Sequence, residues 1–288
     1  MARPATAARR SPAKRKNRIR EIVVAVILIP VCLIWIYPFL WLLSASVKSN
    51  AQVFGGLNLF THVVQLGNYV RAWNQANVGR YFINTSLITG GSIIITVISV
   101  ALMGYVLGRY RFRGKKIVAG LLAAAIFLPE GYTIIPTLDL LNKLHLQSSL
   151  WGLTLAESGG VQVMMILLFA GYFSQLPGEL EEAAIMDGAG FVRVFAQIYL
   201  PLTKPVIATC VILQFMHAWN DFLLPLVVTL NKPNLRTLSV GIYSFQGQYF
   251  TDYSGMAAAA VIGLAPIVIL FLVLQRYFVE GIAGAVKQ

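Results

Sequence analysis

Long apolar runs separated by short polar segments dominate this chain. The first run, residues 22–43, contains no charged residue, and a helix that crosses a bilayer needs about 20 apolar residues. It is also longer than the apolar region of a secretory signal peptide, which has about 7–15 residues. Runs of this kind predict six transmembrane helices. They are Ile22–Leu43, Phe82–Leu107, Ile117–Ile135, Gly152–Phe173, Pro205–Val228 and Met256–Phe278.

The fourth run has two alternative starting points. Glu157 and the pair Gly159-Gly160 lie near its outer end, where a charge and two glycines both disfavour a helix inside a membrane. The helix therefore starts either at Gly152 or near Val161.

Composition places the chain among all-α integral membrane proteins. It has 288 residues, of which 57% are hydrophobic and 12% are charged, whereas soluble domains have about 45–50% apolar and about 25% charged residues. The two cysteines, Cys32 and Cys210, both fall inside apolar runs and lack metal-ligand spacing. We therefore expect them to form neither a disulfide nor a metal site.

The placement of lysine and arginine predicts the orientation of the six helices, because cytoplasmic flanks carry an excess of these residues. With the N-terminus inside, 17 of the 23 Lys and Arg residues fall on inner segments and six on outer ones. The clearest inner markers are residues 1–20 and the loop 109–116. We therefore expect both termini in the cytoplasm. The expected parts are a basic, unstructured tail over 1–21, a six-helix domain over 22–278 and a second tail over 279–288. The basic tail is expected to fix topology and not to bind nucleic acid.

A polar segment, residues 174–204, separates the fourth and fifth runs and predicts two short helices. Ser174 is expected to cap the first helix, with Pro177 in its first turn, and several acids follow where they favour the positive helix end. Gly188 is expected to end this helix in a left-handed turn. One face of the helix then holds Leu180, Ala183, Ala184 and Asp187, by their i, i+3 and i+4 spacing.

A second amphipathic stretch, residues 191–199, follows, and Pro201 is expected to end it before Pro205 opens the fifth span. One interpretation of the two short helices is an amphipathic segment lying in the lipid interface. The acidic first turn argues against it, because interfacial helices prefer Lys and Arg on the polar face. The other interpretation is a docking surface, on which small alanines let another protein approach closely.

Eight residues of this segment have a distinctive spacing, namely Glu182, Ala183, Ala184, Asp187, Gly188, Ile198, Leu200 and Pro201. The pattern resembles the EAA signature of binding-protein-dependent ABC importers. In that family the segment forms a cytoplasmic coupling helix that docks into a cleft of the ATPase subunit. The resemblance implies that these residues couple the chain to an ATPase, and residues 174–204 are called the coupling segment below.

Two further stretches resemble carbohydrate permeases of the same family. The run Trp219-Asn220-Asp221-Phe222 with Pro225 resembles their fifth-span motif, and residues 135–146 resemble their second outer loop. Residues 277–288 resemble the tail of the maltose-type second permease, although Gln288 stands where that family often has glycine. In that subfamily the tail reaches into the ATPase dimer interface. The resemblance implies this role for Gly281, Gly284, Val286 and Lys287.

Taken together, the resemblance implies the membrane-spanning permease subunit of an ATP-driven ABC importer for a sugar, a di- or oligosaccharide. Its partners would be a second permease subunit, two ATPase subunits, an extracytoplasmic sugar-binding protein and the lipid bilayer. The chain would be no enzyme and would bind no cofactor, with ATP and Mg on the partner ATPase. It would cross the bacterial cytoplasmic (inner) membrane several times.

The chain carries no ATP-binding motif of its own. Five residues separate Gly108 from Gly114 where a P-loop has four, and Lys116 stands where Ser or Thr would hold magnesium. Gly104 and Gly108 instead form a small-x₃-small pattern, which we interpret as local helix packing. The three histidines lie far apart in the sequence, so no zinc site is expected.

Polar residues inside membrane-spanning runs are functional candidates by default, because they are costly there. Candidates for the substrate pathway are Gln214, Trp219, Asn220, Asp221 and Glu130. Alternatively, Asn220 and Asp221 lie near the outer interface and hold helix ends. Two other functions stay open: an ABC import permease for another solute, such as glycerol phosphate or a polyamine, and an autonomous secondary transporter.

Overall fold

The computed structural model describes residues 12–56, 58–61, 63–128, 130–147, 149–159, 162–247 and 250–286. Within these ranges the chain is helical, apart from an isolated antiparallel bridge between Gln246 and Thr251. The helices of eight or more residues are α1 (Pro12–Ser46), α4 (Val78–Arg109), α5 (Lys115–Ala125), α6 (Ile134–Lys143), α7 (Leu150–Glu157), α8 (Gln162–Gln175), α9 (Glu179–Met186), α12 (Lys204–Asn220) and α15 (Tyr253–Val286). The shorter elements are α2 (Asn50–Val53), α3 (Gly67–Val70), η1 (Arg71–Gln75), η2 (Glu130–Thr133), α10 (Phe191–Val194), η3 (Phe195–Tyr199), α11 (Leu200–Leu202), α13 (Leu223–Val228), η4 (Pro233–Leu235) and α14 (Leu238–Tyr243). The predicted all-α class is confirmed.

Three helices in the described part of the chain are long and apolar enough to cross a membrane. They are Glu21–Ser46 within α1, Val78–Arg109 as the whole of α4, and Tyr253–Gln275 within α15. Two bent pairs meet the same criterion when each is taken as one span: α7 with α8, bent by 51°, and residues 191–202 with α12, bent by 80°. The described residues therefore supply three to five candidate spans, and the count of six stays a prediction.

The third predicted span is not a continuous helix. α5 ends at Ala125, and residues 126–128 form a turn before the 3₁₀ turn η2. Leu128 precedes Pro129, and a residue before proline is disfavoured in the α conformation; Pro129 itself lies outside the described residues. Helix resumes with α6, so the predicted helix over 117–135 is wrong.

The fourth and fifth predicted spans are each broken. α7 ends at Glu157 and α8 begins at Gln162, close to the later of the two predicted starts. α12 begins at Lys204 with Pro205 in its first turn, as predicted. It ends at Asn220, because Asp221 takes an extended conformation with φ −61° and ψ 134°. α13 is therefore a separate helix, and the prediction of one helix over 205–228 is wrong.

Helix extends into both predicted tails. α1 begins at Pro12, inside the predicted basic tail, and α15 continues to Val286, inside the predicted second tail. The expectation of an unstructured N-terminal tail is therefore wrong from residue 12 onward, and residues 1–11 lie outside the described residues.

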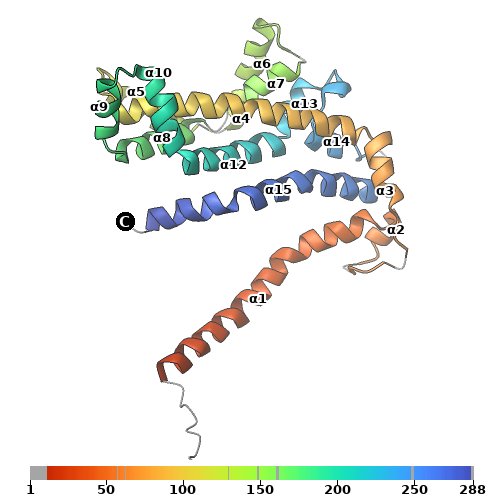
Figure 1. The fold of residues 1–288 in the computed structure, drawn as a ribbon. Coiled ribbons are helices and arrows are strands. Elements are labelled where there is room, and N and C mark those ends of the chain that lie inside the picture. The colour runs from red at the N-terminus through yellow and green to blue at the C-terminus, as the bar shows by residue number, and fades with distance from the viewer. Residues whose placement is uncertain are drawn as a thin grey trace, which may run out of the picture.

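α4 lies at the centre of the helical packing. It contacts α7, α8, α12 and α14, and α12 also contacts α15; the neighbouring courses of α4, α12 and α15 are visible in Figure 1. An added Cβ at Gly104 would lie 2.4 Å from Cβ of Phe169 in α8, and one at Gly108 would lie 2.7 Å from the carbonyl oxygen of Ala170. The prediction that these glycines serve helix packing is confirmed, because only glycine permits this approach.

Different short helices lie at the two ends of α4. Figure 1 places α5, α9 and α10 together at one end of α4, and α2, α3 and α14 toward the other. α1 diverges from the other helices, and its most apolar stretch, within Glu21–Ser46, is 0% buried. At its C-terminal end, Ala45 packs against Val53 and Ala257 near the start of α15. The described chain thus leaves most of α1 uncovered.

Candidate functional site: the coupling segment

The start of the coupling segment differs from the prediction. Ser174 still belongs to α8, and its hydroxyl donates to the carbonyl oxygen of Gly171 (2.7 Å). Gly178 is the N-cap residue of α9 and gives no side-chain cap bond, and Pro177 lies before it in the turn. The predicted Ser174 cap is therefore wrong, because α8 extends further than expected and occupies that residue.

The end of α9 is as predicted. Gly188 has φ +80°, the left-handed conformation that glycine adopts at no steric cost. Its N–H donates to the carbonyl of Ile185 (2.9 Å), and the N–H of Ala189 donates to the carbonyl of Ala184 (2.9 Å). These two bonds form a Schellman motif, which satisfies the last carbonyls of the helix. The motif turns the chain sharply toward α10.

The second half of the segment is helical without interruption from Phe191 to Leu202, through α10, the π-helix η3 and α11. Pro201 lies within α11 and is exposed, so the expectation that it ends the helix is wrong by one residue. Ile198 and Leu200 pack against the apolar cluster around α4 and α8.

Glu181 bonds the coupling segment to its neighbours. Its carboxylate accepts hydrogen bonds from Arg109 Nε (3.2 Å) and from the hydroxyls of Tyr110 (3.0 Å), Tyr199 (3.3 Å) and Tyr105 (3.5 Å). The ion pair with Arg109 is mostly shielded, with side-chain exposures of 13% and 16%. Arg109 also donates to the carbonyl of Leu176 (2.9 Å). These contacts join α9, η3 and the end of α4 at one carboxylate. Glu181, Arg109 and the three tyrosines are called the clamp below.

The electrostatics of the clamp favour neutral tyrosines. Burial raises the pKa of Tyr199 to about 12, although the nearby Arg109 acts in the opposite direction and Glu181 adds to the rise. Burial is also the largest cause of the raised pKa of Tyr110. At neutral pH these hydroxyls are therefore protonated and act as donors to the Glu181 carboxylate.

Three of the four residues on the predicted face of α9 are exposed, namely Leu180, Ala183 and Asp187, whereas Ala184 is 8% exposed and packs in the apolar cluster. Glu182 is also exposed, and contact of this face with another protein stays a prediction. The largest exposed apolar side chain of this helix is Met186, at 86%. Methionine is enriched at protein–protein interfaces, so an exposed Met186 fits a surface that a protein partner covers.

Sequence reasoning missed Glu181 and its partners. Glu181 and Glu182 are adjacent in the sequence, and consecutive residues of a helix lie on different faces. Two signals pointed to the inward one: Arg109 at the inner end of the second apolar run, and tyrosines at 105, 110 and 199. Neither signal is local, so only the packing of α4 against the coupling segment joins them.

Gln214 lies inside the packing of α12. Its amide nitrogen donates to the carbonyl of Glu157 (2.9 Å) and lies 3.3 Å from the hydroxyl of Ser92. The carboxylate of Glu157, at 1% exposure, lies 3.5 Å from Nε2 of His217. These contacts hold α12 to α7 and α4 in this chain, and a role for Gln214 in the substrate pathway stays a prediction.

The fifth-span motif holds helix positions. Trp219 is buried, and its Nε1 donates to the carbonyl of Gly263 in α15 (3.0 Å). Asn220 donates to the carbonyl of Met216 (2.8 Å), and the Asp221 carboxylate accepts from the N–H of Leu223 (3.1 Å) across the break to α13. These bonds match the alternative in which Asn220 and Asp221 hold helix ends.

The remaining predicted residues lie where their side chains are not described. Glu130 is in η2, and Gly281, Gly284 and Val286 are in the last turns of α15; Lys287 lies outside the described residues. Their roles stay predictions. Among the residues that the structure describes, no group of three or more His, Cys, Asp or Glu side chains could hold a metal ion.

Known proteins resemble the chain over nearly its whole length. The family described as "binding-protein-dependent transport system inner membrane component" matches residues 4–284. A probable ABC transporter permease of Bacillus subtilis is 34% identical over 275 residues, which is 95% of this chain and 91% of that protein. The melibiose/raffinose/stachyose import permease of the same organism is 32% identical over 252 residues, covering 87% and 91%.

The fold is similar to that of a solved importer. One chain of the crystal structure of a bacterial ABC transporter involved in alginate import superposes with a TM-score of 0.79, at 24% identity, covering 94% of this chain and 100% of that chain. Relatives of this kind are permease subunits, which are transport components and not enzymes. The chain belongs to the family of inner-membrane components of binding-protein-dependent transport systems.

Proposed function

We propose that the chain is one permease subunit of an ATP-driven ABC importer, and that a separate ATPase subunit drives it through α9. The observation that carries the proposal is an exposed face of α9 on a helix that a mostly shielded ion pair ties to α4. Glu182 and Met186 are exposed on α9, while Glu181 ties the same helix to Arg109 of α4. The spacing of the EAA signature in this segment also supports it.

The clamp offers a direct route from α9 to the membrane-spanning helices. Because Glu181 bonds to the end of α4, a displacement of α9 would move α4 and not deform a loose loop. α4 contacts α7, α8 and α12, so the displacement would spread to the neighbouring helices. Alternating access then needs two packings of these helices, with the loaded binding protein favouring the outward-open one. ATP and Mg would be bound by the partner ATPase.

The cargo that we propose is a sugar, a di- or oligosaccharide. The names of the melibiose/raffinose/stachyose permease and of the alginate importer support a saccharide. Gln214, Trp219, Asn220, Asp221 and Glu130 remain the proposed pathway residues, with Asn220 the most exposed of those whose side chains are described. Another solute, such as glycerol phosphate or a polyamine, is the alternative within the family.

The proposed assembly follows from the family's dependence on a binding protein. The chain would pair with a second permease and two ATPase subunits, and would receive the sugar from an extracytoplasmic binding protein. It would cross the bacterial cytoplasmic membrane six times with both termini inside. The last turns of α15, with Gly281, Gly284, Val286 and Lys287, would reach the ATPase dimer.

Co-purification tests the proposal. The tagged chain is expressed with its native operon and solubilised in detergent, and wild type is compared with Glu182→Lys. Reversing the exposed charge on α9 is expected to reduce the recovered ATPase severalfold, because like charges at an interface repel. Recovery of the second permease is expected to stay unchanged, since α9 alone is altered.

Asp139→Lys is the matched control, because Asp139 is an exposed acid on α6 that pairs with Lys143. This variant is expected to retain the ATPase fully. A chain that purifies alone and transports solute into liposomes without ATP would instead be a secondary transporter. Equal ATPase recovery with Glu182→Lys and with wild type would rule out docking through this face of α9.

A further inference from the structure

The loop that joins α4 to α5 carries an unusual density of positive charge. Residues 109–116 hold three arginines and two lysines. Arg109 is used inside the protein, since it pairs with Glu181. The described residues provide no carboxylate in ion-pair contact with Arg111, Arg113, Lys115 or Lys116. The loop therefore carries positive charge that is not neutralised by Glu181.

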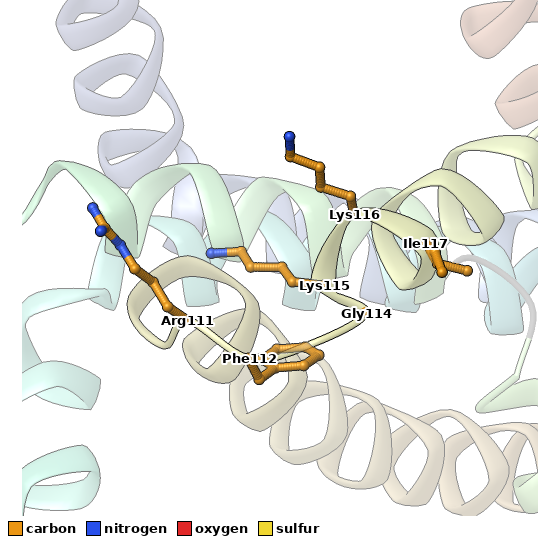
Figure 2. Close-up of a pocket in the computed structure, with 6 residues that line it drawn as sticks. All are labelled: Arg111, Phe112, Gly114, Lys115, Lys116 and Ile117. Carbon is orange, nitrogen blue, oxygen red and sulfur yellow. The ribbon is translucent and has the colours of Figure 1, made fainter.

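Part of this charge surrounds a hollow. An open cavity of about 470 Å³ is lined by Arg111, Phe112, Gly114, Lys115, Lys116 and Ile117. In Figure 2 the side chains of Arg111, Lys115 and Lys116 lie on one side of the loop and that of Phe112 lies on the other, and the ammonium group of Lys115 extends toward Arg111. Lys115 is steadied by a bond from its ammonium group to the carbonyl of Tyr110 (3.1 Å), which leaves two of its three donors free.

The loop also carries apolar side chains at the level where a span ends. Phe112 is 40% exposed and Ile117 is 69% exposed. α4, one of the candidate spans, ends at Arg109, and α5 begins at Lys115. Aromatic side chains and long basic residues at such a position fit the boundary between headgroups and acyl chains.

We propose that this hollow is a binding site for the phosphate headgroup of an anionic lipid. Arg111, Lys115 and Lys116 would hold the phosphate, while Phe112 and Ile117 would contact the upper part of the acyl chains. Arginine suits this role because its planar donors match phosphate oxygens. The inference needs only that the loop lies at a membrane surface, so it does not depend on the cargo or on the ATPase.

A contact with a soluble protein is the alternative use of the same charge. The mixture of three cations with flanking apolar groups beside a span favours lipid, because a protein partner of such a hollow would need acidic side chains inserted at the headgroup level. Orientation by the positive-inside effect needs only the number of charges. It does not need Arg111, Lys115 and Lys116 to line one hollow.

Lipid binding to the purified complex tests the proposal. The full-length chain with its co-purifying subunits is titrated with phosphatidylglycerol and, separately, with phosphatidylcholine, and bound lipid is counted by native mass spectrometry. The wild type is compared with the variant Arg111→Gln/Lys116→Gln. At about fivefold in affinity for each basic residue near an anionic surface, the double variant is expected to bind phosphatidylglycerol about 30-fold more weakly. Phosphatidylcholine binding is expected to stay equal.

Lys232→Gln/Arg236→Gln is the matched control, because it removes the same charge from a segment away from this loop. It is expected to retain the phosphatidylglycerol affinity of the wild type. Both double variants replace side chains that the fold does not pair, so circular dichroism should show unchanged helix content.

Equal phosphatidylglycerol affinity in the loop variant and wild type would overturn the proposal. Displacement of the lipid by inorganic phosphate would also overturn it in favour of a soluble anion. Loss of the ATPase with unchanged lipid binding would assign the loop to a protein contact.

Discussion

Two neighbouring glutamates in α9 have different surroundings. Glu181 is enclosed by Arg109 and three tyrosines, whereas Glu182 is exposed. A carboxylate that accepts several hydrogen bonds and an ion pair stabilises the fold around it. An exposed carboxylate contributes little to stability and is available to a partner. The two residues should therefore respond differently to the same substitution.

We expect Glu181→Gln to cost about 2 kcal/mol of stability, because it leaves the Arg109 guanidinium partly buried without its counter-charge. Glu182→Gln is expected to change stability by less than about 0.5 kcal/mol. Thermal unfolding in detergent, with the rate of proteolysis in residues 174–204 as a local probe, measures both effects. A larger loss for Glu182→Gln than for Glu181→Gln would contradict the clamp.

The tyrosines of the clamp make its stability depend on alkaline pH. Tyr199 has a pKa raised by burial from about 10 to about 12 in the folded state. Below pH 10 the hydroxyl is protonated in both states, and its contribution is complete. As the pH rises from 10 to 12, the unfolded chain ionises first, so the folded state loses stability through this window.

The unfolding temperature of the wild type is therefore expected to fall between pH 10 and pH 12, and to fall less steeply in Tyr199→Phe. Tyr132→Phe is the control, because Tyr132 is 80% exposed and should reproduce the wild-type slope. Identical slopes in Tyr199→Phe and Tyr132→Phe would remove Tyr199 from the origin of the effect.

At the scale of elements, the contact between α4 and α8 depends on glycine. Gly104→Ala is expected to destabilise the protein by about 1–3 kcal/mol, because its new Cβ would overlap Phe169. Gly90 lies in the same helix and has open space around it, so Gly90→Ala is the matched control. It is expected to be neutral or slightly stabilising, since alanine favours helix. Thermal unfolding of both variants in detergent decides the point.

The elements that the sequence predicted correctly are those set by local chemistry. The apolar runs of α1, α4 and α15 are long and unbroken, so their spans appear in the structure close to the predicted ends. Gly188 and Pro205 also have the predicted positions, because a left-handed turn and a first-turn proline are local requirements.

The predictions that failed have two origins, one in how hydropathy is averaged along the chain and one in contacts between distant segments. The breaks after Ala125 and at Asp221 lie close to polar or helix-breaking residues, Pro129-Glu130-Gly131 and Asn220-Asp221. Mean hydropathy over a window of about 20 residues averages these residues with their apolar neighbours, so the spans were predicted as continuous helices. The Glu181 clamp joins residues 105–110 to residues 181 and 199. The sequence pattern does not show which of Glu181 and Glu182 faces inward. Only the packing of α4 against η3 distinguishes the two.

At the scale of the whole molecule, the uncovered surface of α1 and the position of the coupling segment both depend on how the chain lies in the membrane. Excess Lys and Arg predict that residues 109–116 and α9 are cytoplasmic, and that the segment between α1 and α4 is outside. A docking site for an ATPase is useful only on the side that holds ATP. Orientation is therefore the property on which the functional proposal rests.

Single cysteines and a membrane-impermeant maleimide test this orientation in intact cells. The background replaces Cys32 and Cys210, and the reporters are Phe60→Cys, at a side chain that is 92% exposed, and Arg113→Cys on the loop between α4 and α5. Phe60→Cys is expected to be labelled in intact cells, and Arg113→Cys only after the membrane is permeabilised. The reverse pattern would place α9 outside the cell, where no ATPase could reach Glu182, and would exclude the importer proposal.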